Sequence, residues 1–179
     1  LRRLGALPGV EHAAVTSALP LSSGDWGYIA QLPGDTRRWT DLPLENFRVA
    51  SPGYFEAIHL RLLQGRYFSA SDWGRNEAVI SELTAKTLWK GKNPLGQQFS
   101  VNTKTNEPFT VVGVVENART VSLAKPDPMI IYAPYWYHLN DYVGLVVRTR
   151  QEPAAMAEAI RKTVWSVDAG VPVPEVRTL

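Results

Sequence analysis

Apolar residues in this chain gather in short runs separated by turn residues, a pattern typical of β-strands. The run 109–115 is apolar on both faces, which predicts a central strand of a sheet. The segment 44–50 alternates instead, with Phe47 and Val49 on one face and Arg48 on the other, and this predicts a half-buried strand. Further strands are expected to begin at residue 10 and to cover 28–32, 77–80, 98–101, 129–133, 143–149 and 173–176.

Helices are expected where apolar residues recur at spacings of three and four. The clearest covers 153–167, with an apolar stripe formed by Met156, Ile160, Val164 and Val167. It should pack on the strands near 10–19 and 143–149. Another helix is expected over 1–7, ending at a Pro-Gly pair.

Three serines stand where helix caps are expected. Ser51 precedes a proline that suits the first helical position, so it should cap a helix carrying Tyr54 and Phe55. Ser69 and Asp72 have the spacing of a capping box, and Ser81 should cap the next helix. Strands outnumber helices and the helices are interspersed, so the predicted class is α+β, with mixed sheets and packed helices.

The order of turns predicts two lobes. The smaller lobe, 69–134, is expected as an insertion into a lobe built from 1–68 and 135–179. A continuous doubly wound sheet would contradict this division.

Composition limits the possible folds and partners of the chain but indicates no activity. Hydrophobic residues make up 45% of the chain and charged residues 20%, which predicts a packed core. The net charge of +2 without a basic run makes nucleic acid an unexpected partner. The lack of cysteine excludes disulfides and thiol chemistry. No apolar stretch approaches the roughly 20 residues that span a bilayer. The chain opens on Leu1 inside an expected helix, so we expect a piece of a longer protein.

Candidate chemistry is sparse. His12, His59 and His138 are far apart and lack metal-ligand spacing. There is no Gly-x-Ser-x-Gly elbow and no Gly-Lys-Ser/Thr phosphate loop. We therefore predict no catalytic, cofactor-binding or metal-binding residue and no enzyme; a hydrolase with convergent residues is the enzymatic rival. For Arg66 we expect a structural role, pairing with a carboxylate or capping carbonyls within the domain; the alternative is a ligand contact.

Aromatic residues in the expected loops are the remaining candidates for function. They suit protein–protein contacts and equally suit packing beneath long loops. These aromatic residues are Trp26, Trp39, Tyr135, Trp136, Tyr137 and Tyr142. Among them we predict Trp136 and Tyr137 as partner contacts.

Taken in order, several short motifs make the chain resemble one family. They include Pro8-Gly9-Val10, Tyr54-Phe55, Leu62-Leu63-Gln64-Gly65-Arg66-Tyr67-Phe68, Leu88-Trp89 with Gly91, Pro94 and Gly96, Val111 to Val115 with Asn117-Ala118-Arg119, Tyr132-Ala133-Pro134, Val146-Val147-Arg148-Thr149, and Asp168, Pro172-Val173 and Val176-Arg177-Thr178-Leu179. Each motif is weak, but the ordered set covers most of the chain. It resembles the extracytoplasmic core domain of MacB/FtsX-like ABC-transporter permeases. One departure is Ser81, where the family often has asparagine.

The resemblance implies a non-catalytic domain on the periplasmic side of a protein of the cytoplasmic (inner) membrane. It implies a porter-like lobe with an inserted, smaller Sabre-like lobe, and no cofactor. The implied partners are the transmembrane helices of the permease, indirectly the cytoplasmic ATPase, and a second permease copy or an extracytoplasmic adaptor. The implied function is coupling of ATP-driven helix movement to export or to such a partner. The alternative is a binding domain that captures a lipid, peptide or lipoprotein in its own pocket.

Overall fold

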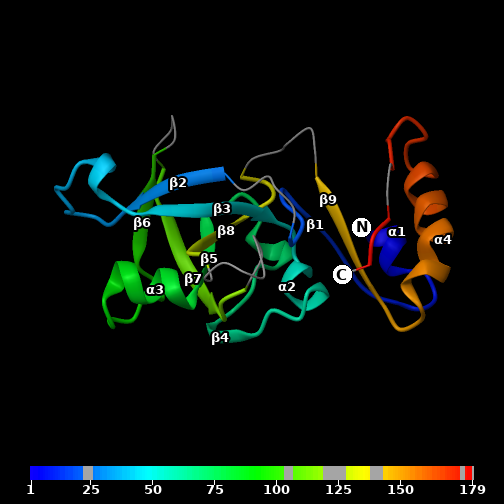
Figure 1. Cartoon of the computed structure of the whole chain (residues 1–179), viewed down its shortest axis with the longest axis horizontal. Coiled ribbons are helices and arrows are strands. Elements are labelled where there is room, and N and C mark those ends of the chain that lie inside the picture. Colours follow the sequence, from blue (N-terminus) through cyan, green and yellow to red (C-terminus); the bar gives the residue numbers. More distant parts are fainter. Residues whose placement is uncertain (22–25, 103–106, 119–127, 138–142, 174–175, 179) are drawn as a thin grey trace.

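A computed structural model of the chain describes residues 1–21, 26–102, 107–118, 128–137, 143–173 and 176–178 (Figure 1). The helices are α1 (Arg2–Gly5), α2 (Tyr54–Ala57), α3 (Glu82–Trp89) and α4 (Pro153–Trp165), with 3-10 turns η1 (Trp39–Asp41) and η2 (Ala70–Asp72). The strands are β1 (Val10–Thr16), β2 (Trp26–Gln31), β3 (Leu44–Ala50), β4 (Leu62–Gly65), β5 (Glu77–Ser81), β6 (Gln98–Val101), β7 (Phe109–Val115), β8 (Ile130–Pro134) and β9 (Gly144–Thr149).

The strands pair in the order β2-β6-β7-β5-β8-β3-β1-β9, with β4 added to β7. The pairs β3–β8 and β5–β7 are parallel, and the other pairs are antiparallel. This mixed sheet with interspersed helices confirms the predicted α+β class. Within the described residues, no helix is long and apolar enough to cross a membrane.

Strand β2 closes part of this sheet into a ring. Its first residues pair with β3, from Trp26 opposite Phe47 to Ile29 opposite Leu44. Its last two residues, Ala30 and Gln31, pair with β6. The ring therefore runs β2-β6-β7-β5-β8-β3 and back to β2, and every one of these strands contributes to a single core cluster. That cluster, the ring core, contains Ala30, Phe47, Val49, Ala78, Ile80, Trp89, Phe99, Val101, Phe109, Val111, Val114, Ile131 and Ala133.

Strand β3 corrects one expectation. It was predicted to be half-buried, yet both Glu45 and Arg48 have no exposed surface. The reason is topological, because β3 lies between β8 and β1 and also pairs with β2. At Arg48 the face that the sequence pattern predicts to be solvated is therefore covered, whereas Leu44 at the start of the strand is 64% exposed.

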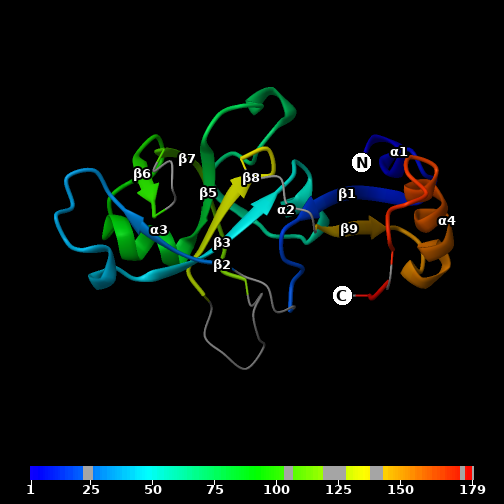
Figure 2. The same cartoon turned by 90° about the horizontal axis from the view of Figure 1, so that it is seen from above.

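The helix α4 packs where the sequence predicts. Met156 and Ile160 are buried against Leu4 of α1. Around them lie Val10 and Ala13 of β1 and Leu145 and Val147 of β9. Figures 1 and 2 show α1, β1, β9 and α4 together at one end of the molecule, away from β6 and α3.

The expected lobes share the sheet. Strands of the segment 69–134 pair with strands outside it, since β6 pairs with β2, β7 with β4 and β8 with β3. The division into 69–134 and the two flanking segments stays a prediction. The end built from α1, β1, β9 and α4 has its own small core, separate from the ring core.

Two local predictions need correction. Ser51 does not cap α2, because the residue before that helix is Gly53 at φ 86°. The Ser51 hydroxyl instead accepts a hydrogen bond from the Val15 N–H at 2.9 Å, tying β1 to the end of β3. The strand expected over 173–176 is absent at residues 173 and 176, and the two residues between them lie outside the described part.

Candidate functional site

Arg66 follows β4 and holds two carboxylates. Its guanidinium donates to both oxygens of Asp72, at 2.6 and 3.1 Å, and to Glu77 Oε2 at 2.6 Å. Asp72 also accepts from the Ser69 N–H and hydroxyl, each at 2.8 Å, completing the predicted capping box of η2. The expected pairing of Arg66 inside the domain is confirmed, and it ties the end of β4 to η2 and to the start of β5.

The charges of this cluster support one another. Burial by itself raises the pKa of Asp72, but hydrogen bonds from Ser69 and Arg66 outweigh it and lower that pKa below its ordinary value. Burial likewise lowers the pKa of Arg66, whereas its bonds to Asp72 and Glu77 raise it, and the net shift is upward. Asp72 and Arg66 therefore stay charged at neutral pH, and Arg66 has a structural role.

An aromatic cluster lies beside this ion pair, formed by Trp73, Tyr135 and Trp136. The ring centroids are 5.4 Å apart for Trp73–Trp136 and for Tyr135–Trp136, and 5.8 Å apart for Trp73–Tyr135. The Trp136 indole N–H donates to the Arg75 carbonyl at 3.2 Å. Trp73 is 63% exposed, so this cluster presents a broad aromatic edge to solvent.

The two predicted partner contacts are placed differently. Trp136 belongs to the aromatic cluster, whereas Tyr137 is half-buried against the ring core. The Tyr137 ring lies 4.6 Å from Phe109 and 6.0 Å from Phe47. Sequence reasoning missed Trp73 as a surface residue, although its position directly after the capping Asp72 placed it at the end of a turn. The side chains of Trp26 and Tyr142, and all of His138, lie outside the described part.

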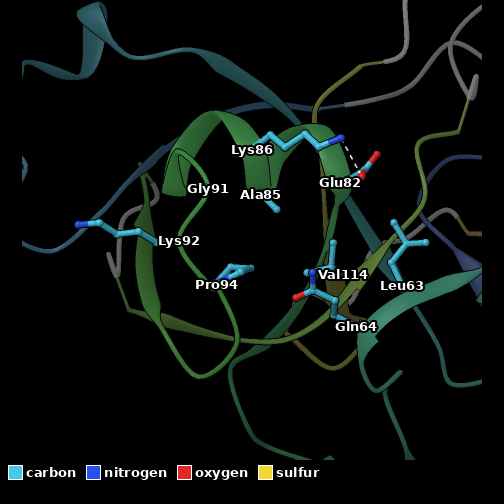
Figure 3. Close-up of a pocket in the computed structure, with 9 residues that line it drawn as sticks. All are labelled: Leu63, Gln64, Glu82, Ala85, Lys86, Gly91, Lys92, Pro94 and Val114. Atoms are coloured by element: carbon cyan, nitrogen blue, oxygen red, sulfur yellow. Dashed lines mark ion pairs between the residues drawn. The ribbon is translucent and has the colours of Figure 1, made fainter.

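A groove runs between α3 and β4, and we call it the α3–β4 groove (Figure 3). It encloses about 370 Å³. In Figure 3, Glu82 and Lys86 line the side formed by α3, Leu63 and Gln64 the opposite side, and Val114 lies between them. The lining residues are Leu63, Gln64, Glu82, Ala85, Lys86, Gly91, Lys92, Pro94 and Val114.

A buried polar network joins β3 to α3. Glu45 is fully buried, and its Oε2 accepts a hydrogen bond from the Thr84 hydroxyl at 2.8 Å. Ser81 caps α3 as predicted, accepting from the Thr84 N–H, and it also accepts from the Ile130 N–H. Glu45 Oε1 has no hydrogen-bond partner in the structure as described. Burial raises the pKa of Glu45 to about 7, although the bond from Thr84 lowers it.

The described residues contain no cluster of histidine and carboxylate side chains able to hold a metal ion. His12 lies on β1 and His59 follows α2, at a positive φ of 56°. The groove carries no histidine or serine in its lining. The described part of the chain presents two surface features, the aromatic cluster and the α3–β4 groove.

Comparison with known proteins agrees with this fold. Residues 2–163 match the family described as the MacB-like periplasmic core domain. The macrolide export ATP-binding/permease protein MacB of Azoarcus sp. (strain BH72) is 32% identical over 84 residues, which are 46% of this chain and 12% of that protein. The matched stretch is thus a small part of that relative's length.

Solved structures show the same fold. The periplasmic region of MacB from Actinobacillus actinomycetemcomitans superposes with a TM-score of 0.65 at 18% identity, covering 93% of this chain and 71% of that one. The extracellular domain of the ABC-type transporter YknZ from Gram-positive bacteria gives a TM-score of 0.60 at 20% identity, covering 90% and 74%. The chain belongs to the MacB-like periplasmic core domain family, and it is an extracytoplasmic domain of a MacB-like ABC-transporter permease.

Proposed function

We propose that this domain is a non-catalytic coupling element of its permease. It transmits the movement of membrane helices, driven by a cytoplasmic ATPase, to export or to an extracytoplasmic partner. The observation that carries the proposal is the family match over residues 2–163. The inner membrane is the proposed location of the whole protein, with this domain on its periplasmic side.

The packing supports a coupling role. The Arg66 ion pairs bind β4, η2 and β5 into one unit, and the aromatic cluster lies directly beside them. A rigid unit moves as a body, so a displacement at one end reaches the exposed ring of Trp73 and the half-buried ring of Trp136. Coupling requires that these rings make different contacts in two states of the transporter.

The test uses the whole permease in its membrane. Trp73→Ala and Trp136→Ala are expected to reduce export several-fold while the ATPase domains stay folded and bind nucleotide. Leu44→Ala is a control, because Leu44 is a 64% exposed apolar residue on β3, outside the connections that carry the two tryptophans, and it should leave export unchanged. Export at the parental level in both tryptophan variants would contradict the proposal for this surface.

The enzymatic rival is tested separately. The purified chain is expected to show no turnover of ester, peptide or glycoside substrates. Turnover that is lost on replacing His12 or His59 would show that the domain is an enzyme.

A further inference from the structure

We propose that the aromatic cluster of Trp73, Tyr135 and Trp136 binds a proline-rich peptide segment in the polyproline II conformation. This segment belongs to the extracytoplasmic partner of the proposed function, on which the inference rests. Three features of the cluster support it: contacting aromatic rings at the surface, hydrogen-bond donors without partners, and connections that are held in place by the fold.

The rings give the cluster an apolar surface. Trp73 is 63% exposed, and Tyr135 and Trp136 are half-buried. All three rings contact one another, with centroids 5.4, 5.4 and 5.8 Å apart. Proline-rich segments dock on aromatic surfaces of this kind, because the proline ring is apolar and rigid and packs against an aromatic face. The rings therefore offer the apolar part of such a site.

The polar groups that the cluster leaves without partners are donors. Neither the Trp73 indole N–H nor the Tyr135 hydroxyl has a hydrogen-bond partner among the residues that the structure describes. The Arg75 side chain is 66% exposed, and its contact with Glu77 is long, at 3.8 Å. An indole and a guanidinium can only donate, and a phenol can donate as well. A ligand of this surface therefore needs acceptors.

The carboxylates on either side of Trp73 are already in use. Asp72 and Glu77 both accept hydrogen bonds from Arg66, and their side chains are only 5% and 11% exposed. A glycan, whose hydroxyl groups need acceptors as well as donors, is thus a poorer match. A polyproline II helix fits better, because proline has no backbone N–H and the carbonyls of this helix form no internal hydrogen bonds.

Both connections are held in place without a partner. The capping box fixes η2 directly before Trp73. The Tyr135 N–H donates to the Ala50 carbonyl at 3.0 Å, and the Trp136 indole joins the two connections through the Arg75 carbonyl at 3.2 Å. A polyproline II helix is also preformed, so little conformational entropy is lost on either side when the two associate.

The experiment uses the 179-residue chain and fluorescein-labelled decaproline. Fluorescence anisotropy should show saturable binding. A labelled peptide of the same length with alternating glycine and serine, which is flexible, should bind about tenfold more weakly. Chitohexaose, a soluble glycan, should not compete. Absence of saturable binding, equal binding of the glycine–serine peptide, or competition by chitohexaose would each overturn the proposal.

Variants locate the binding on the protein. Trp73→Ala should weaken the binding of decaproline about tenfold. Trp73→Phe and Tyr135→Phe keep an aromatic ring but remove one donor, and each should weaken it about fivefold. Trp165→Phe is the matched control, since Trp165 is a 41% exposed tryptophan on α4 whose indole N–H already donates to the Val171 carbonyl. It should bind as the parent does.

A thermal melt of each variant establishes that it is folded. Binding by Trp73→Phe at the parental level would show that the indole N–H takes no part, and it would overturn the proposal. Equal losses in Trp73→Phe and Trp165→Phe would place the binding outside the cluster and overturn it as well.

Export by the whole permease separates this inference from the proposed function. If Trp73→Ala and Trp136→Ala reduce export while the chain binds no decaproline, the coupling role of this surface stands and the proline-rich partner is wrong. If the chain binds decaproline through Trp73 while both variants export at the parental level, the proline-rich partner stands and the coupling role of this surface is wrong.

Discussion

Gly65 lies directly opposite Gly113 in the antiparallel β4–β7 pair. A Cβ on Gly65 would overlap the Val112 carbonyl oxygen, and a Cβ on Gly113 would overlap the Arg66 carbonyl oxygen. The two glycines therefore allow the backbones of β4 and β7 to approach closely at the end of β4. Arg66, which binds Asp72 and Glu77, follows directly after this point. Gly65 also has a φ of 73°, in the left-handed region that favours glycine.

Gly113→Ala should destabilise the domain by about 3 kcal/mol, at the upper end of overpacking costs, because the obstacle is backbone and cannot turn aside. Urea unfolding followed by circular dichroism measures this free energy. Gly34→Ala is a control, since Gly34 has a φ of 79° but open space around its Cα. It should cost only the strain of the left-handed conformation, about 1–2 kcal/mol. A smaller loss in Gly113→Ala than in Gly34→Ala would contradict the close approach.

Arg66→Met should destabilise the domain by about 2 kcal/mol. The change leaves Asp72 and Glu77 facing each other, with side chains 5% and 11% exposed. The loss is less than for a deeply buried pair because the Arg66 side chain is 45% exposed. Arg38→Met removes an exposed ion pair and should change stability by less than about 0.5 kcal/mol.

The pairing of Arg66 with Asp72 should make the stability of the domain depend on pH in the acid range. The pKa of Asp72 is lower in the folded state than in the unfolded state. Its stabilising contribution to the free energy of unfolding is therefore fully present above the unfolded-state pKa, and it is lost as the pH falls through the folded-state pKa. Unfolding free energy measured from pH 6 downwards should fall less steeply in Arg66→Met than in the parent. An unchanged acid slope would show that the pairing does not stabilise the fold.

The first and last residues of several strands could be predicted, because the hydrophobic pattern that marks them is local in the sequence. The strands 44–50, 98–101 and 109–115 begin and end where the hydrophobic pattern predicts. The closing of the ring through β2 could not be predicted, since it depends on pairings between residues far apart in the chain. Strand β4 was missed because two leucines followed by Gln-Gly look like the approach to a turn.

The candidate surfaces were only partly predictable. The spacing of Ser69 and Asp72 identified the capping box, because that motif is contained in four residues. Alternation along β3 assigned Arg48 to solvent, since a pattern cannot show that a neighbouring segment covers the second face. Trp136 was predicted as a surface contact, and its partner ring Trp73 was missed because the two lie in different connections.

Tyr137→Ala and Trp73→Ala should differ in their effect on stability, because Tyr137 packs against the ring core whereas Trp73 lies at the surface. Tyr137 contacts Phe109 and Phe47, so its removal should cost about 2 kcal/mol, less than a fully buried aromatic ring. Trp73 is 63% exposed, and Trp73→Ala should change stability by less than about 1 kcal/mol. Chemical denaturation of the isolated chain measures both. A larger loss in Trp73→Ala would show that the aromatic cluster holds the fold together.

Glu45 should make the stability of the domain fall between about pH 4.5 and pH 7. The pKa of this carboxyl is raised from 4.5 to about 7 by burial, so the folded state keeps its proton after the unfolded state has lost it. Its unfavourable contribution therefore grows as pH rises through this window and levels off above it. The full effect is about 3 kcal/mol.

Glu45→Gln tests this by removing the ionisation while keeping the shape and the acceptor for Thr84. The variant should be more stable than the parent by about 3 kcal/mol at pH 8 and nearly equal to it at pH 4.5. Glu158→Gln is the control, because Glu158 is 63% exposed in an ion pair on α4, and its pH dependence should follow the parent. A parent and a Glu45→Gln variant with parallel stability curves would show that Glu45 is solvated, and that the network with Thr84 and Ser81 opens in solution.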